Sequence, residues 1–366
     1  MIKLFLIIVS ILSLPLPVVY ATDVGKEKLK DKLKVAFVYV GPVGDMGWSY
    51  SHDQGRLEME KALKGKVETG YIESVQEGPA AERVIEDYAR KGYGLIITTS
   101  FGFMDATINV AKKFPKVKFV HISGYKTAEN VSTVFGQIEG PFYVSGMVAG
   151  KMSKKGLVGF VAAHPIPEVI RNANAFALGV RKSNPKAVVK VVWTNTWFDP
   201  VKEKEAAVAL LNAGCDIIGQ DQDTAEPQKA AESKGALGIG YHTDMSKLAP
   251  KAFLTSPIWK WGKKYTEVAK SIIEGKYKSE SYWGGWHEGV VDISPMTKLV
   301  PTDVQKYIKS EVELFKSGKK TIYDVFKGEL KDNSGKVMVA AGKSMSKEEL
   351  WNMNWLVEGV EGTVPK

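Results

Sequence analysis

Cysteine is almost absent from this chain, because Cys215 is the only one among 366 residues. A single cysteine cannot close a disulfide within the chain, so stability must come from packing. Cys215 stands just before an apolar, strand-like run, which predicts a small buried residue rather than a reactive thiol. No cysteine follows the N-terminal apolar run, where a lipoprotein needs one, and we therefore expect no lipid anchor.

Long apolar runs are missing beyond the N-terminus. The chain begins with a basic residue, Lys3, and an apolar run over residues 4–14, which Pro15 and Pro17 then interrupt. This layout is typical of a secretory signal peptide. The run is too short for a bilayer span, which needs roughly 20 apolar residues. We therefore expect residues 1–21 to be a signal peptide, and the protein to be periplasmic or otherwise extracytoplasmic and unanchored.

Motifs for catalysis, metal binding and cofactor binding are also missing. The five histidines show no zinc-ligand spacing, and no acidic run completes a calcium loop. There is no nucleophile elbow, phosphate loop or dinucleotide fingerprint. The net charge of +9 is spread without a basic patch, which argues against a nucleic-acid partner. We expect no enzyme activity, no catalytic residue, no metal and no cofactor.

The chain does contain a regular alternation of strand and helix patterns. Continuous apolar strands separated by helices indicate parallel sheets covered on both faces. The predicted strands are residues 34–40, 67–72, 94–99, 117–122, 156–162, 187–193, 216–219 and 237–241. The rhythm restarts after Gly136, so we predict an α/β fold of two doubly wound units, followed by a tail with a hairpin turn at 332–335.

Aromatic and acidic residues follow several of these strands, and the carboxyl ends of parallel strands are where ligands bind. The candidate ligand-binding residues so found are Asp45, Trp48, Phe101, Phe103, Asp105, Trp197, Asp221, Asp223, His242 and Asp244. Two aromatic faces would stack on a flat ligand, and carboxylates would accept its N–H groups. A purine has this chemistry.

Structural interpretations of the same residues stay open. A strand-end tryptophan is as often a lid on the core as a ligand contact. Asp105 and Asp199 stand where helix N-caps are expected. Asp221 and Asp223 would also suit a solvent-exposed loop.

Several motifs together resemble the basic-membrane-protein family of ABC-transporter substrate-binding proteins, which includes the purine nucleoside receptor of spirochaetes. They are residues 44–48 (GDMGW), 98–105 (TTSFGFMD), 135–140 (FGQIEG), 146–150 (GMVAG), 165–176 (PIPEVIRNANAF), 197–200 (WFDP) and 283–286 (WGGW). The resemblance implies a two-lobed type I periplasmic-binding-protein fold with three crossings, near Gln137, Ser256 and Trp283. It further implies one lobe of residues 33–136 plus 256–282 and a second of residues 137–255 plus 283–366.

The resemblance also implies roles for single residues. Trp48 and Trp197 match positions that stack on opposite faces of the base, and Asp45 with residues 101–105 matches its edge. Arg171 lies in one of the shared motifs and is expected to bind ligand. Nucleoside-binding members carry an acid for the ribose hydroxyls where this chain has His242, followed by Asp244. The departure favours a free base such as adenine, delivered by a monomer to an ABC permease in the membrane.

Two other classes of function stay open from the residues alone. Acids around a stacked base would also suit a secreted purine-nucleoside hydrolase. A ligand-sensing subunit of a signalling receptor would share the whole fold and differ only in its protein partner.

Overall fold

The first of two parallel sheets is built from strands that are buried on both faces. The computed structural model describes residues 32–365, and in this range the first sheet has six strands in the order β12-β5-β4-β3-β1-β2. The strands are β1 (Leu33–Tyr39), β2 (Val67–Ile72), β3 (Leu95–Thr99), β4 (Lys118–Ile122), β5 (Val131–Gly136) and β12 (Ser281–Gly284). Continuous apolar runs such as residues 35–39 are buried on both sides because helices cover both faces.

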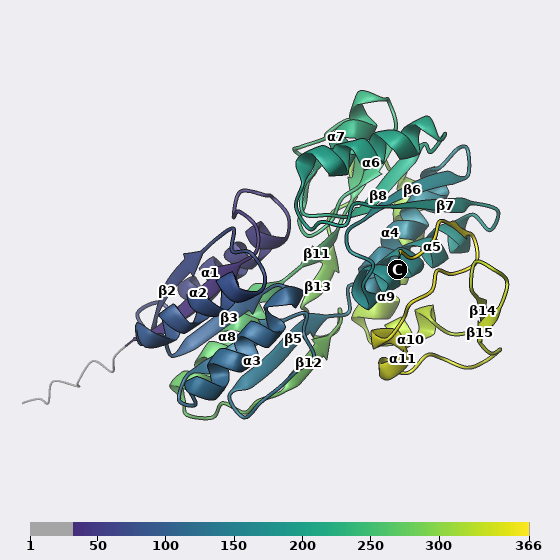
Figure 1. The fold of residues 1–366 in the computed structure, drawn as a ribbon. Helices are drawn as coiled ribbons and strands as arrows, with labels where there is room; N and C mark the ends of the chain where they lie inside the picture. Colours follow the sequence, from purple (N-terminus) through teal and green to yellow (C-terminus); the bar gives the residue numbers. More distant parts are fainter. Residues whose placement is uncertain (1–31, 366) are drawn as a thin grey trace, which may run out of the picture.

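Four helices and a 3₁₀ turn cover this sheet. They are α1 (Trp48–Ala62), α2 (Pro79–Arg90), the turn η1 (Phe101–Phe103), α3 (Met104–Lys113) and α8 (Trp261–Ile273). Helices α2 and α3 contact each other, and α1 contacts α8. Ile85, Phe103 and Val110 share one apolar core with the sheet residues Val38 and Ile96. We refer to this sheet and its helices as the first lobe (Figure 1).

The second sheet repeats this arrangement with the order β10-β9-β8-β6-β7-β16. Its strands are β6 (Leu157–Ala162), β7 (Val188–Trp193), β8 (Ile217–Asp221), β9 (Leu237–Ile239), β10 (Phe253–Thr255) and β16 (Val360–Glu361), and its helices are α4 (Glu139–Met152), α5 (Pro167–Ser183), α6 (Pro200–Asn212) and α7 (Glu226–Ser233). Helices α4 and α5 pack so closely that a Cβ at Gly146 would lie 2.1 Å from the Phe176 carbonyl oxygen. This sheet and its helices form the second lobe.

Three stretches of chain connect the lobes. The first leads from β5 into α4, and the second runs from β10 through β11 (Pro257–Trp259) to α8. The third runs from β12 through β13 (Val291–Ile293), which pairs antiparallel with β11. Figure 1 shows this two-stranded ribbon between the lobes. The residue boundaries given above for the lobes stay a prediction.

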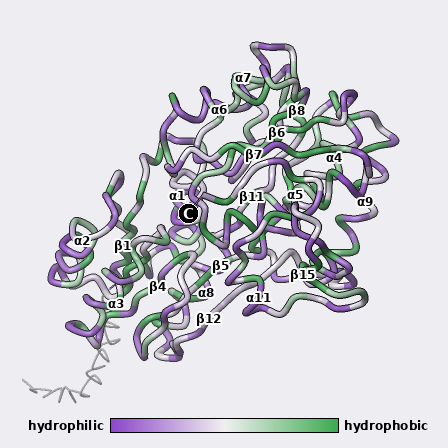
Figure 2. Tube along the Cα trace, turned by 45° about the vertical axis from the view of Figure 1, so that its right-hand side comes forward, coloured by the Kyte–Doolittle hydropathy of each residue, from purple (hydrophilic) through white to green (hydrophobic). Residues whose placement is uncertain are grey.

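The C-terminal part of the chain packs against the second lobe. It contains α9 (Thr302–Lys316), α10 (Ile322–Val325), the antiparallel pair β14 (Leu330–Lys331) and β15 (Val337–Val339), and α11 (Lys347–Trp351). Asn174 of α5 holds it through 2.8 Å hydrogen bonds, donating to the Trp355 carbonyl and accepting from the Val357 amide. Figure 2 shows hydrophobic residues along the central strands and hydrophilic stretches on outer helices such as α2 and α9.

The predicted fold class is confirmed, and so is the turn between two short strands at residues 332–335. Among the elements that were not predicted are β5, α8 and the first turns of α1. In α1, residues 48–55 look like a continuation of the glycine-rich loop, but they begin the helix. Along the described residues, no helix has both the length and the apolar character of a membrane span. The predicted signal peptide lies outside the described residues.

Candidate ligand-binding site

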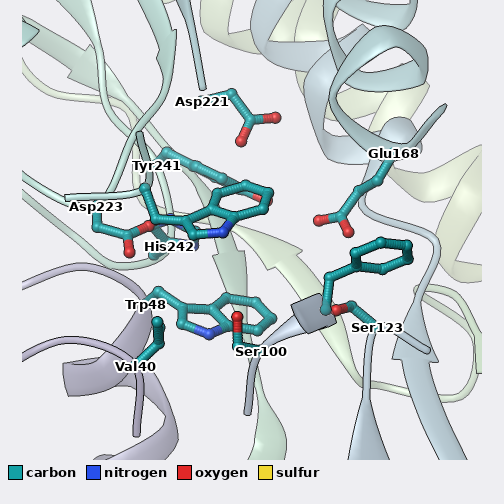
Figure 3. Close-up of a pocket in the computed structure, with 11 residues that line it drawn as sticks. Val40, Trp48, Ser100, Ser123, Glu168, Asp221, Asp223, Tyr241 and His242 are labelled. Carbon is teal, nitrogen blue, oxygen red and sulfur yellow. The ribbon is translucent and has the colours of Figure 1, made fainter. Parts of the chain in front are cut away.

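A pocket lies between the lobes at the carboxyl ends of strands from both sheets. Its empty space, including space open to solvent, is about 350 Å³. The first lobe contributes Val40, Trp48, Ser100, Phe101 and Ser123, and the second contributes Glu168, Trp197, Asp221, Asp223, Tyr241 and His242 (Figure 3). Six of the predicted site residues therefore line one pocket: Trp48, Phe101, Trp197, Asp221, Asp223 and His242.

Trp48 is held rigidly at the floor of this pocket. Its indole Nε1–H donates to the Thr99 carbonyl over 2.6 Å, which ties the ring to the end of β3. The rings of His52 and Trp261 stand nearly perpendicular to it, with ring centres 4.2 and 5.8 Å away. A ring fixed in this way loses little conformational freedom when it stacks on a ligand.

Trp197 comes from the loop between β7 and α6. Asp199 ends this loop by capping α6, because its carboxylate accepts the Lys202 amide. The Trp197 ring lies against His164 at 4.6 Å between ring centres, and its carbonyl accepts the Asp223 amide. Asp199 is thus the helix cap that the sequence allowed.

Three carboxyl groups face the pocket. Asp221, Asp223 and Glu168 line it, and none of its lining residues is Lys or Arg. Burial raises the pKa of Asp221 to about 7, although a hydrogen bond from Asn172 to its carboxylate lowers it. Burial and then the neighbouring Asp221 raise the pKa of Glu168 well above its ordinary value. Figure 3 shows the carboxyl groups of Glu168 and Asp221 turned into the pocket.

His242 is neutral and fully hydrogen-bonded. Its Nδ1 accepts the indole N–H of Trp259 over 3.0 Å, so the ring proton resides on Nε2. That nitrogen donates to Asp223 Oδ1 over 3.1 Å, and burial lowers the pKa of His242 to about 3. The other carboxyl oxygen of Asp223 is buried and has no hydrogen-bond partner among the described residues. Asp223 therefore keeps one carboxyl oxygen for a ligand, and burial raises the pKa of this carboxyl group well above its ordinary value.

Asp45 and Arg171 do not line this pocket. The Asp45 carboxylate accepts the amides of Gly47, Ser49 and Tyr50 at the start of α1, where an anion offsets the helix dipole. Arg171 donates from Nε to Glu139 over 2.6 Å and from Nη1 to the Leu350 carbonyl over 3.1 Å. Both side chains organise segments that border the site.

Phe103, Asp105 and Asp244 also lie elsewhere. Phe103 is fully buried in the core of the first lobe. The Asp105 side chain is 74% exposed and pairs with Lys126. Asp244 accepts the Ser246 amide within its own loop. Their sequence positions after strands do not decide the direction of their side chains.

Sequence reasoning missed Val40, Ser100, Ser123, Glu168 and Tyr241. Glu168 lies in the first turn of α5, directly after the loop that follows β6. The available signal was an acidic residue in the first turn of a helix that follows a strand end. Such residues usually interact with the helix dipole instead of a ligand.

The two lobes touch next to the pocket. Gly47 lies so near Asp223 that a Cβ on Gly47 would be 2.0 Å from the Asp223 carbonyl oxygen. The Thr243 hydroxyl, in the loop after β9, donates to the carbonyl of Met46, the residue before Gly47. Asp223 therefore takes part both in the pocket and in the contact between the lobes.

Two lobes, three connections and a pocket between strand ends define the periplasmic-binding-protein class of fold. Solved structures agree on the fold: a solute-binding protein from Conexibacter woesei matches with a TM-score of 0.65 at 20% identity, covering 81% of this chain and 100% of that one. One from Aeropyrum pernix matches with a TM-score of 0.69 at 18% identity, covering 78% and 92%.

Sequence comparisons narrow the class to a family. Residues 32–325 match the model described as ABC transporter substrate-binding protein PnrA-like, so the chain belongs to this basic-membrane-protein family. A purine-binding protein of Brucella abortus is 44% identical, over 93% of this chain and 97% of its own length. A Haloferax volcanii protein named for glucose binding by an ABC transporter is 37% identical, over 95% and 85%.

Proposed function

We propose that this protein binds a purine base, adenine in preference, between its lobes and delivers it to an ABC permease. Residues 1–21 are removed on export, and the protein acts as an unanchored monomer outside the cytoplasm. The observation that carries the proposal is the pocket itself, where Trp48 and Trp197 come from opposite lobes and three carboxyl groups but no Lys or Arg form the lining. Such a site suits a flat ligand rich in N–H donors.

The preference for a base over a nucleoside is supported by His242. In nucleoside-binding relatives an acid at this position would accept ribose hydroxyls. Here both ring nitrogens of His242 are already used, by Trp259 and Asp223. A ribose placed beside His242 would leave hydroxyls without partners, and each costs about 1–3 kcal/mol when buried.

The preference for adenine is supported by a polar atom that the pocket leaves unused. Asp223 lines the pocket, and its Oδ2 is buried without a partner among the described residues. Adenine offers its exocyclic amine and a ring N–H as donors. A protonated Glu168 would also match adenine, because a carboxylic acid donates to N1 and accepts from the amine.

Titration calorimetry on protein that has been unfolded and refolded to remove bound ligand tests the proposal. Adenine, adenosine and glucose are titrated separately, glucose because indole faces and carboxylates also suit a hexose. We expect one site per chain and the tightest binding for adenine. Tighter adenosine binding would refute the base preference, and continuous heat with adenosine would mean hydrolysis. Binding of glucose alone would refute the purine assignment.

A matched pair of tryptophan variants tests the site. Trp197→Ala should weaken adenine binding by roughly 1–3 kcal/mol, because a stacking face is lost. Trp193→Ala is the control, since this residue lies on β7 outside the pocket and its indole donates to the Thr363 carbonyl. Equal losses in the two variants would remove Trp197 from the binding site.

A further inference from the structure

A second cavity adjoins the pocket. Its empty space, including space open to solvent, is about 360 Å³, and it is lined by Phe101, Ser123, Tyr125, Phe135, Ile166, Pro167, Glu168, Arg171 and Trp351. We refer to it as the annex. Phe101, Ser123 and Glu168 line both cavities, so the annex continues the pocket rather than forming a separate site.

The walls of the annex are mainly apolar. The first lobe supplies the rings of Tyr125 and Phe135, and the second supplies Ile166, Pro167 and Trp351. Tyr125 is 57% exposed. Its backbone N–H donates to the Met104 sulfur, but no hydrogen bond to another described residue holds its hydroxyl. The annex therefore offers aromatic and aliphatic surface at the mouth of the site, where an unoccupied apolar surface would face water.

The one cation in the annex wall is already neutralised. Arg171 pairs with Glu139 at 2.6 Å, and both side chains are almost completely buried. Its guanidinium also lies 5.4 Å from the centre of the Trp351 ring. An anionic or sugar substituent would have to displace these partners, whereas an apolar group would not. The annex thus favours an apolar occupant.

Glu168 stands at the junction of the two cavities and decides which ligand atom points into the annex. Its carboxyl group is the acidic function shared by both cavities. An exocyclic amine that donates to Glu168 would lie at the junction. If that amine carries one substituent, it keeps one N–H for Glu168 while the substituent extends between Tyr125 and Trp351.

We infer that the site accepts an aminopurine whose exocyclic nitrogen carries an apolar alkyl or aryl group, with the group seated in the annex. This inference rests on the proposed function, because it assumes that the base occupies the pocket. The ligand class differs from a nucleoside in the position and the polarity of its substituent.

Three ligands of related size test the inference by calorimetry on the refolded protein: adenine, N6-benzyladenine and 9-benzyladenine. We expect N6-benzyladenine to bind roughly tenfold or more tightly than adenine, on the scale of burying a phenyl ring. We expect 9-benzyladenine to bind no more tightly than adenine. If adenine binds but N6-benzylation brings no gain, the annex inference is wrong and the proposed function stands. A gain only at position 9 overturns the inferred orientation. If none of the three binds, the proposed function itself fails.

Variants then test whether the tighter binding of N6-benzyladenine comes from the annex. Ile166→Trp should fill the annex and Tyr125→Ala should remove one wall, so the ratio of the two affinities should fall toward one in both. The ratio is the readout because any general loss of folded protein affects both ligands alike. Tyr307→Ala is the control, since Tyr307 is an exposed aromatic residue on α9 outside both cavities. An unchanged ratio in Ile166→Trp and Tyr125→Ala would place the benzyl group elsewhere.

Discussion

Replacing Arg171 by methionine should destabilise the second lobe, because Glu139 would lose its only ionic partner within residues 32–365. Arg171 is 2% exposed and Glu139 is fully buried in the pair. One carboxyl oxygen of Glu139 already has no hydrogen-bond partner among the described residues. The substitution would leave the whole carboxylate uncompensated, and breaking a buried pair from one side typically costs about 3–5 kcal/mol.

The predicted loss of stability is large because both side chains are buried. Two companion variants test this reason. Arg171→Met combined with Glu139→Met should recover most of the loss, since an apolar replacement of both partners removes the buried charge. Lys91→Met breaks a pair with Asp87 whose side chains are 62% and 57% exposed. That variant should cost less than about 1 kcal/mol.

Urea denaturation followed by tryptophan fluorescence measures the three variants, and adenine titration is carried out on each. The reasoning would be refuted if Arg171→Met lost no more than Lys91→Met, or if the double variant lost as much as the single one. A full loss of adenine binding by stable Arg171→Met protein would instead support the role in ligand binding that the family resemblance implies.

Two further predictions concern the contact between the lobes and the buried acids. Gly47→Ala should weaken adenine binding roughly tenfold or more, because the added Cβ would meet the Asp223 carbonyl oxygen. Gly44→Ala is the calorimetric control, since a Cβ there has nothing within 4 Å. Equal affinities in the two variants would show that the contact between Gly47 and Asp223 does not matter for closure of the lobes. Burial raises the pKa of Asp221 and of Glu203 to about 7, so the folded chain holds more protons than the unfolded chain between about pH 4 and 7. The free energy of unfolding should therefore fall as the pH rises through this window, by up to about 1.4 kcal/mol per pH unit for each group, and Glu203→Gln should reduce that slope in urea titrations at pH 5 and pH 8. An unchanged slope in Glu203→Gln would contradict the assignment of the proton to this residue.

The strands of both sheets were the most predictable part of the fold. Runs such as residues 35–39 are apolar throughout because both faces of a parallel sheet are covered. β5 was missed although it is fully buried, since Ser132 and Thr133 interrupt its apolar pattern. The start of α1 was missed because its first turns carry Ser49, Ser51 and His52 rather than strong helix formers.

The candidate site was predictable to the extent that strand ends identify it. Trp48 and Trp197 line the pocket as expected from their positions after strands. Asp45 follows the same rule, yet it caps α1, because whether an acid meets a helix N-terminus or a cavity depends on loop geometry. The positions directly after strands do not include Glu168. It belongs to a helix of the second lobe and lines the pocket from there.

The two-residue strand β16 has a consequence for solubility. It pairs with β7 on the side opposite β6 and so covers hydrogen-bonding groups that would otherwise form an open sheet edge. Uncovered edges of this kind invite pairing with other chains. A chain that ends before Gly359 should therefore self-associate, seen as increased light scattering, while its pocket residues stay in place. If the truncated protein stays monodisperse, the uncovered edge of β7 does not cause self-association.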